Sequence, residues 1–381
     1  MGNRSEAFRR LLARRLFSTL GGVTIDRLKS LLDENGWRID AAGWPRCLAL
    51  FGSAAWNTLL AAWEEDLHGA AIRATDVAPP LFILGHWRSG TTHLHNLLAQ
   101  DSRFGFPTLY ACLYPHHFLS SERWLGRLWA NAVPRKRLID NMSARFWVPF
   151  EDEFAVATMT GLSPYLGWAF PEREDHYERY LSFEGVAAED VDRWKAALLL
   201  FVRKVALRSQ KPLVLKSPPH TARVRLLLDL FPDARFVHIR RDPFEVFPST
   251  RHMVSVAYTL SNFHAFDLRG LDERVFRRYR VLEERYRADR ALIPSGRLHE
   301  LTYEELVRDP IGALDRLYAA LGLGDLSPAL PVLDKYLAKQ GEYRRNEYPP
   351  LDSATRERVK REWGGDEVGG PRLYGATKSC L

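Results

Sequence analysis

Residues 81–98 contain a short apolar run, a loop bounded by glycines and the start of a helix, and no other stretch constrains the fold as much. The run Leu81–Leu84 is typical of a buried strand. The loop from Gly85 to Gly90 carries one cation, Arg88. A strand that leads through a glycine loop into a helix N-terminus points backbone N–H groups at an anion, and the helix dipole adds to the attraction. The stretch therefore predicts an anion-binding loop at the edge of a sheet.

The glycine spacing is similar to that of a Walker A loop, but its register differs. A Walker A loop places Lys and then Ser or Thr directly after the second glycine. Here Thr91 and Thr92 follow Gly90, and Arg88 lies two residues before that glycine. The loop can hold a phosphate, but it lacks the lysine and the magnesium-binding hydroxyl in the positions that a kinase uses. An ordinary glycine turn between a strand and a helix is the alternative interpretation.

Short apolar runs alternate with helical periodicity in the second half of the chain. We expect strands at Leu213–Leu215, Arg235–Ile239 and Leu298–Thr302, and a helix over Asp192–Arg208. Strands that alternate with helices predict an α/β fold, in which a parallel sheet is covered on both faces. Ligands of such sheets bind beyond the carboxyl ends of the strands.

Two further polar motifs follow the expected strands. Lys216 opens the sequence Lys-Ser-Pro-Pro-His-Thr, and Arg241 opens Arg-Asp-Pro, with Ser249 eight residues after it. A guanidinium at a strand end and a hydroxyl two turns into the next helix can converge on one phosphate. A solvated lysine and a helix-capping Arg–Asp pair are the alternative interpretations, and Arg240 is an alternative ligand for the phosphate.

The loop Gly-His-Trp-Arg-Ser-Gly-Thr-Thr resembles the 5′-phosphosulfate loop of sulfotransferases that use 3′-phosphoadenosine 5′-phosphosulfate (PAPS), in the Arg-Ser-Gly-Thr-Thr form of many bacterial members. The Lys216 motif resembles their bacterial Lys-Ser-Pro-x-His form. Arg241 with Ser249 resembles their 3′-phosphate site, and Tyr303 resembles a tyrosine that lies beside the nucleotide. The motifs follow the family order over about residues 81–249, with Tyr303 in addition.

The resemblance implies a P-loop-like parallel sheet flanked by helices, and transfer of a sulfuryl group from PAPS to a hydroxyl of a small or lipid-like acceptor. Arg88 and Lys216 are expected to neutralise the oxygen that bridges phosphate and sulfate. PAPS is then a co-substrate, and no metal is expected. The residues expected to bind PAPS are Arg88, Ser89, Gly90, Thr91, Thr92, His93, Arg241, Ser249 and Tyr303.

The base that takes the acceptor's proton is the role that the sequence constrains least. Pro218 stands where the cytosolic sulfotransferases have their catalytic His, and Ser102–Pro115 contains no carboxylate where some relatives have a Glu. An acidic group beside an aromatic pocket suits a base, although three carboxylates in a row usually form a solvated surface. We expect His220 first and Glu153 second. The full set of candidates is His220, His116, His117, Glu151, Asp152 and Glu153.

The chain is expected to divide into a helical N-terminal extension, residues 1–75, and a sulfotransferase domain, residues 79–381. Within that domain, residues 104–190 show no clear strand order and are rich in aromatic side chains. These features suit an acceptor-binding insertion around a bulky apolar pocket, and rings that simply fill a helical core are the alternative. Arginines flank leucines in the basic amphipathic segment around residues 9–17, which either packs on its own domain or lies on a membrane.

Charge and composition narrow the classes of partner. The 381 residues hold 54 Lys and Arg against 47 Asp and Glu, and the formal net charge of +7 suits an anionic cofactor or weak attraction to a membrane surface. The basic residues are scattered, so no nucleic-acid partner is expected. The three cysteines are widely spaced, and neither a transmembrane run nor a signal-peptide core is visible. We therefore expect a cytoplasmic protein, with peripheral membrane contact as an option.

Two alternative functions stay open at this point. An ATP-dependent phosphotransferase fits the glycine loop, but it conflicts with the register of the loop and lacks a recognisable acidic magnesium site. A non-catalytic, nucleotide-binding, membrane-peripheral module is supported only by the basic N-terminal segment.

Overall fold

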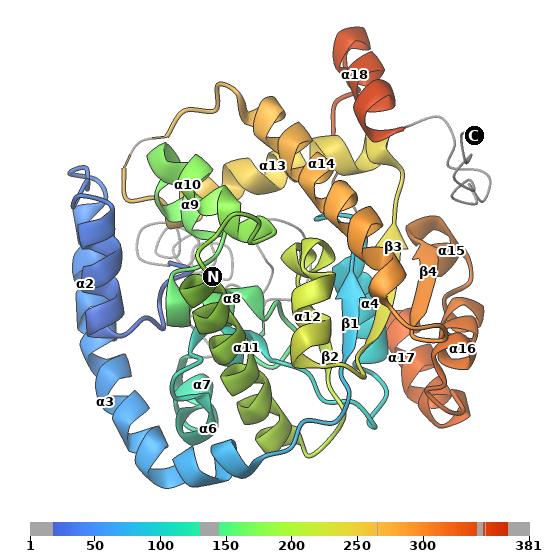
Figure 1. Cartoon of the computed structure of the whole chain (residues 1–381), viewed down its shortest axis with the longest axis horizontal. Helices are drawn as coiled ribbons and strands as arrows, with labels where there is room; N and C mark the ends of the chain where they lie inside the picture. Colours follow the sequence, from blue (N-terminus) through green and yellow to red (C-terminus); the bar gives the residue numbers. More distant parts are fainter. Residues whose placement is uncertain (1–17, 130–144, 265, 341–345, 347, 365–381) are drawn as a thin grey trace, which may run out of the picture.

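The computed structural model describes residues 18–129, 145–264, 266–340, 346 and 348–364 (Figure 1). The basic segment around residues 9–17 lies outside the described residues.

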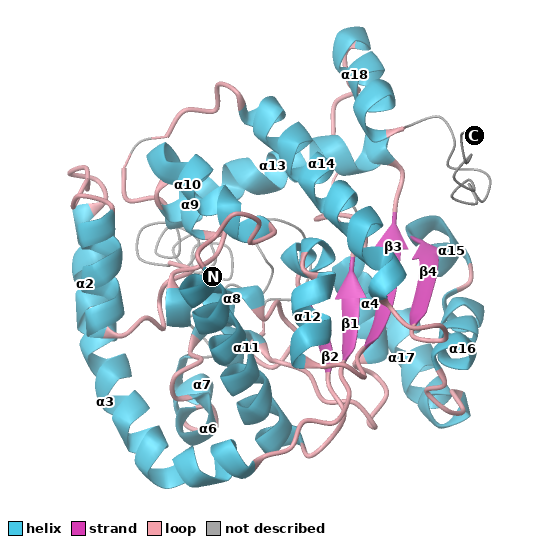
Figure 2. Ribbon diagram, in the orientation of Figure 1, coloured by secondary structure: helices cyan, strands magenta, loops and turns pink. Residues whose placement is uncertain are grey.

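Four parallel strands form one sheet in the order β2-β1-β3-β4 (Figure 2). Ile83 pairs with Lys216, and Leu84 pairs with His238. Because the strands all run the same way, their carboxyl ends meet at one edge of the sheet. The predicted α/β fold with a parallel sheet is confirmed. The strands are β1 (Leu81–Leu84), β2 (Val214–Lys216), β3 (Arg235–Arg240) and β4 (Leu298–Thr302).

The side chains of β1 alternate between two apolar cores. Leu81 and Ile83 pack in one core, and Phe82 and Leu84 pack in the other. Alternation with a period of two is the geometry of a strand, so a wholly apolar β1 requires helices on both faces of the sheet. The helices that supply these cores are α4 (Thr91–Leu98), α16 (Pro310–Leu321) and α17 (Leu330–Gln340) on the first face, and α11 (Ala188–Ser209) and α12 (Val224–Leu230) on the second.

The N-terminal region folds into two helices, α2 (Ile25–Glu34) and the long α3 (Trp44–Ala74). Its helical character is as expected. Leu28 and Leu50 of these helices share the apolar core that holds Phe82 of the sheet. The two helices therefore extend the core of the sheet. The domain boundary near residue 75 stays a prediction.

The described residues between α4 and α11 form short helices. Several aromatic rings of this region are buried against one another, and Tyr165 stacks on Trp168 with ring centroids 4.3 Å apart. Its role in acceptor binding stays a prediction. The helices are α5 (Leu109–Leu113), α6 (Phe118–Ser121), α7 (Leu125–Trp129), α8 (Glu153–Thr160), α9 (Leu166–Ala169) and α10 (Glu174–Glu178), with 3₁₀ turns at Pro171–Arg173 and Arg179–Leu181.

The remaining helices follow β3 and β4. The Asp242 carboxylate caps α13 by accepting a hydrogen bond of 2.9 Å from the Phe244 N–H. No helix among the described residues is long and apolar enough to cross a membrane. These elements are α13 (Pro243–Ser261), α14 (Leu271–Asp289), α15 (Tyr303–Arg308) and α18 (Ser353–Trp363), with 3₁₀ turns at Pro218–Ala222, Arg290–Leu292 and Ser327–Ala329.

Candidate active site

At two positions of the loop between β1 and α4, the backbone has a conformation that only glycine adopts without strain. Gly85 has φ +145° and Gly90 has φ +100°. A Cβ on Gly90 would lie 2.3 Å from the ring of Tyr303, and a Cβ on Gly85 would lie 2.5 Å from the carbonyl oxygen of Ile239. The loop therefore lies tight against the neighbouring strand and the start of α15, and α4 begins directly after it.

The two predicted phosphate motifs meet at this loop. The Arg88 guanidinium donates through Nε to Ser249 Oγ over 2.8 Å, and the Arg88 carbonyl accepts a bond of 3.2 Å from Arg241 Nη1. The Arg241 guanidinium lies over the ring of Tyr303, 4.4 Å from its centroid. Arg88 itself has φ +69°, a conformation that is rare for a residue with a side chain. Four of the predicted PAPS residues are thus in mutual contact at the carboxyl edge of the sheet.

The other predicted residues of the loop lie at the start of α4. The buried Ser89 hydroxyl donates to the His86 carbonyl over 2.7 Å, and Thr91 is buried at the first position of the helix. The His93 ring meets the Tyr303 ring edge-on with centroids 6.4 Å apart. Thr92 accepts a hydrogen bond of 3.3 Å from Lys216 Nζ. Thr92 therefore links the loop to the lysine at the end of β2.

Lys216 is buried and forms an ion pair with Glu151, with 2.7 Å between Nζ and Oε1. The other carboxylate oxygen of Glu151 accepts a hydrogen bond from the Tyr165 hydroxyl, which in turn accepts a bond of 3.1 Å from Trp87 Nε1. Burial, and then the Glu151 carboxylate, raise the pKa of the Tyr165 phenol well above its usual range, so the phenol stays protonated and remains a donor. The contacts join the glycine loop, β2 and the aromatic-rich region around one carboxylate.

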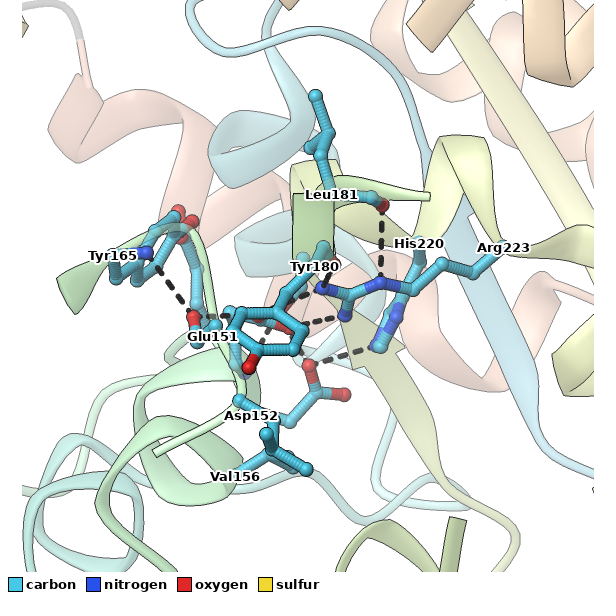
Figure 3. Close-up of polar contacts among 12 residues, drawn as sticks. Glu151, Asp152, Val156, Tyr165, Tyr180, Leu181, His220 and Arg223 are labelled. Carbon is cyan, nitrogen blue, oxygen red and sulfur yellow. Dashed lines mark hydrogen bonds and ion pairs between the residues drawn. The ribbon is translucent and has the colours of Figure 1, made fainter. Parts of the chain in front are cut away.

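The three consecutive carboxylates of residues 151–153 have three different partners, and Figure 3 shows the contact between Asp152 and His220. Glu151 binds Lys216. Asp152 lies 2.9 Å from Nε2 of His220 and accepts a hydrogen bond from the Ser217 hydroxyl. Burial opposes ionisation of Asp152, but His220 and Ser217 outweigh it and hold the pKa of this carboxyl below its usual value.

Glu153 forms a fully buried pair with Arg223. The two guanidinium nitrogens of Arg223 lie 2.5 and 3.0 Å from the two carboxylate oxygens of Glu153, and the Ser163 hydroxyl donates to the same carboxylate over 2.6 Å. Arg223 also donates to the carbonyls of Tyr180 and Leu181 (Figure 3). The pair ties the turn after β2 to the start of α8.

The two residues that the sequence favours as the base, His220 and Glu153, pair with other residues, whereas Glu151 pairs with Lys216. His220 and Glu153 are fully buried, with 0% of each exposed, and their ion-pair partners are Asp152 and Arg223. The His220 ring also packs edge-on against Phe82, with centroids 5.4 Å apart. The structure places Lys216 against Thr92 of the candidate PAPS loop, and the carboxylate that pairs with Lys216 is Glu151.

The two other candidate histidines lie at the interface with the N-terminal helices. His117 contacts Ser121 and Asn57, and burial lowers its pKa to about 4, with Lys204 adding to the effect. The pKa of His116 is lowered to about 3, again mainly by burial. Both rings are therefore neutral at physiological pH.

Sequence reasoning missed Tyr165 and Trp87 as neighbours of the site, and it held Glu151 only as one of three adjacent carboxylates. The signal that could have found Tyr165 is weak, because a buried tyrosine among many aromatic residues looks like core. Among the described residues, no group of three His, Cys, Asp or Glu side chains is arranged to hold a metal ion.

Comparisons with known proteins show the family of this chain. The model of the sulfotransferase family matches residues 79–327. The chain is 41% identical over 345 residues to the omega-hydroxy-beta-dihydromenaquinone-9 sulfotransferase Stf3 of Mycobacterium bovis, covering 90% of this chain and 88% of the relative. The protein of that name from Mycobacterium tuberculosis matches with the same identity and coverage.

Two solved structures have the same fold. The sulfotransferase STF1 of Mycobacterium tuberculosis superposes with a TM-score of 0.64 at 19% identity, covering 96% of this chain and 98% of that one. The sulfotransferase STF9 of Mycobacterium avium gives a TM-score of 0.63 at 22% identity, covering 90% and 96%.

The buried Arg223–Glu153 pair predicts a large loss of stability when one partner is removed. We expect Arg223→Met to lower the free energy of unfolding by about 3–5 kcal/mol, because it leaves Glu153 charged, buried and unpaired. The matched control is Arg225→Met on α12, whose side chain is 63% exposed in its pair with Asp289 and which should cost at most about 1 kcal/mol. Urea unfolding measures both, and equal losses would contradict the structural role assigned to Arg223.

The contact between Gly90 and Tyr303 predicts a second stability effect. Gly90→Ala is expected to cost about 1–2 kcal/mol for its backbone conformation and about 1–3 kcal/mol more for the clash with the ring. Gly36→Ala is the control, since Gly36 also has a positive φ of +63° but has no atom within 4 Å of an added Cβ. Thermal unfolding of both variants, each also made with Tyr303→Ala, separates the two costs. If Tyr303→Ala relieves nothing in the Gly90 variant, the close contact is wrong.

Proposed function

Because this chain belongs to the sulfotransferase family, we propose that it transfers the sulfuryl group of PAPS to the hydroxyl of a lipid-like acceptor, with Glu151 as the base. The observation that carries the assignment is the contact between Glu151 and Lys216 beside the glycine loop. Membership of the sulfotransferase family argues against the two alternative functions, an ATP-dependent phosphotransferase and a non-catalytic module.

The residues at the sheet edge fit the two phosphates of PAPS. The loop backbone over Ser89–Thr92 and the N-terminus of α4 suit the 5′-phosphosulfate, since α4 begins directly after the glycine loop. Arg241 and Ser249, with Arg88 hydrogen-bonded to the serine, suit the 3′-phosphate. When bound, PAPS supplies the sulfuryl group.

Glu151 is the carboxylate best placed to take the acceptor's proton. It is 9% exposed, whereas Asp152 and Glu153 are completely buried. Tyr165 donates to one of its oxygens and Lys216 pairs with the other, so the carboxylate is fixed at the edge of the loop. Glu151 removes the hydroxyl proton as the acceptor oxygen bonds to sulfur and the bond between sulfur and the phosphate oxygen breaks.

Lys216 and Arg88 supply positive charge where negative charge develops. Sulfuryl transfer resembles phosphoryl transfer, in which charge spreads over the oxygens of the transferred group and catalysis depends on cations and positioning. Lys216 is 1% exposed, so its charge acts at low local dielectric. After transfer it balances the charge on the departing phosphate oxygen.

Aromatic side chains around Glu151 support an apolar acceptor. Phe154 lies between Phe150 and Tyr165, with ring centroids 5.1 and 4.8 Å apart, and Tyr165 stacks on Trp168. A hydroxyl carried on an apolar chain suits a carboxylate among such rings. The similar mycobacterial enzyme is named for an omega-hydroxylated dihydromenaquinone, and we propose an acceptor of that chemical class, an apolar lipid-like alcohol.

Replacing the base tests the assignment directly. Glu151→Gln is expected to lower kcat about 10²–10⁴-fold, because it removes the proton acceptor and keeps the shape of the side chain. Turnover is followed with labelled PAPS and a set of long-chain and isoprenoid alcohols. The control, His220→Gln, should lose stability but keep turnover per folded molecule. Full activity in Glu151→Gln, or loss of turnover only in folded His220→Gln, would return the role of base to the histidine.

The 3′-phosphate site has its own test. Arg241→Ala is expected to weaken binding of adenosine 3′,5′-bisphosphate about 10–100-fold, the effect of one charged hydrogen bond, and to change binding of adenosine 5′-monophosphate much less. Titration calorimetry measures both ligands. Arg240→Ala is the matched control, because Arg240 ends β3 as an exposed neighbour, and its effect should stay within about twofold. Equal losses for the two nucleotides would show that Arg241 does not recognise the 3′-phosphate.

A further inference from the structure

The long helix α3 exposes an apolar stripe along its outer side. Trp44, Leu48, Trp56, Leu59 and Trp63 are 42–63% exposed, and their spacing of three, four or eight residues places them on one face of the helix. The other exposed positions from 44 to 63 are proline, alanine and glycine, so this face carries no charge over about 30 Å. Figure 1 shows α3 along the outer edge of the molecule.

The stripe is unusual in size and composition. Its five large side chains present on the order of 500 Å² of apolar surface, which is near the upper limit for patches on monomeric proteins and marks an interaction site. Trp37 is 42% exposed and stacks on Phe51 of α3, with ring centroids 6.0 Å apart. The tryptophans add an indole N–H to a large apolar body, and this combination favours the interface between water and lipid.

The inner side of the same helix holds its polar residues. Arg46 donates to the carbonyl of Asn262, and Asn57 donates to the carbonyls of Gly21 and Val23 over 2.9 Å. Glu64 is 1% exposed and pairs with Lys204 over 2.5 Å. These buried contacts fix the rotation of α3, because turning the stripe inward would break all of them. The outward direction of the apolar face is therefore built into the fold.

Charges of both signs lie near the end of the stripe: Glu65 and Asp66 are exposed on α3 shortly after Trp63, and basic residues follow α6. The Ser120 N–H donates to Glu64 over 2.9 Å, which places α6 beside the C-terminal half of α3. Arg123 and Arg127 follow on exposed positions after α6, together with Trp124 and Leu128, which are 48% and 71% exposed.

The chain that precedes the described residues is also basic. Residues 1–17 include Arg9, Arg10, Arg14 and Arg15, and they join the described chain at Ser18, three residues before the Gly21 carbonyl that binds Asn57 of α3. The formal net charge of +7 of the whole chain favours attraction to a surface that contains anionic lipids.

We propose that the outer face of α3 docks the enzyme on the surface of a bilayer that contains anionic lipids. The indole and leucine side chains enter the headgroup region, and the net positive charge of the chain favours the anionic surface. Binding of α3 to a bilayer does not depend on the proposed function. The benefit of this binding rests on the proposed function, because it would give the enzyme access to an apolar acceptor held in the same bilayer.

Vesicle binding by the full chain tests the proposal. The probes are sedimenting vesicles of phosphatidylcholine with phosphatidylglycerol, and of phosphatidylcholine alone. The double variant Trp56→Gln/Leu59→Gln is expected to bind the anionic vesicles at least about tenfold more weakly. The control is Leu268→Gln/Val332→Gln, which removes side chains of 47% and 49% exposure elsewhere on the surface, and its binding should stay within about twofold. Circular dichroism and binding of adenosine 3′,5′-bisphosphate report that both variants fold.

Three results would overturn the proposal. Binding that is equal in the two double variants would show that α3 is not the docking face, and so would binding that is lost only on deletion of residues 1–17. Sedimentation that shows a dimer, converted to a monomer by the α3 variant without loss of vesicle binding, would assign the stripe to a second copy of the chain. Failure of vesicle binding can be distinguished from failure of the proposed function. Turnover of a short soluble alcohol should not change in the α3 variant, because that acceptor does not need a bilayer.

Discussion

Three adjacent carboxylates hold the aromatic-rich region against the end of strand β2, and the active site depends on that attachment. Glu151 and Glu153 pair with Lys216 and Arg223, and Asp152 lies between them against His220. A buried charge is costly unless it is paired with good geometry. Each carboxylate therefore fixes a separate point of the turn after β2, and together they set the position of α8 relative to the sheet.

The three carboxylates differ in exposure and in their partners, and this difference is the basis for proposing Glu151 as the base. Asp152 and Glu153 are surrounded by protein, whereas Glu151 keeps some exposure and contacts the lysine beside the glycine loop. Burial and the Lys216 charge lower the pKa of the nearby His95 to about 3. His95 is therefore neutral at physiological pH, and the positive charge at this point of the sheet belongs to Lys216.

The sequence predicts the sheet well because its strands follow local rules, and the placement of the candidate phosphate residues follows from the sheet. The carboxyl ends of parallel strands meet at one edge, so residues just after strands, such as Lys216 and Arg241, are brought together by the topology alone. The base follows no such rule. Successive residues at the start of a helix point about 100° apart, and a run of three carboxylates does not reveal which one of them faces the loop. His220 follows a well-marked motif, but the 3₁₀ turn over Pro218–Ala222 carries its ring inward against Phe82.

The orientation of α3 was hidden from the sequence for a related reason. Trp56 and Leu59 look like core residues, and Asn57 and Glu64 look like surface residues, so periodicity alone would place this helix the other way round. The reversal requires partners from distant segments, and the chain supplies them in Lys204, Asn262 and the carbonyls of Gly21 and Val23. A helix whose polar side is buried by specific contacts keeps its apolar side in solvent unless something covers it. The proposed acceptor and the proposed docking surface share one physical basis: an apolar alcohol dissolves in a bilayer, so its apolar character would explain both the rings around Glu151 and the exposed tryptophans of α3.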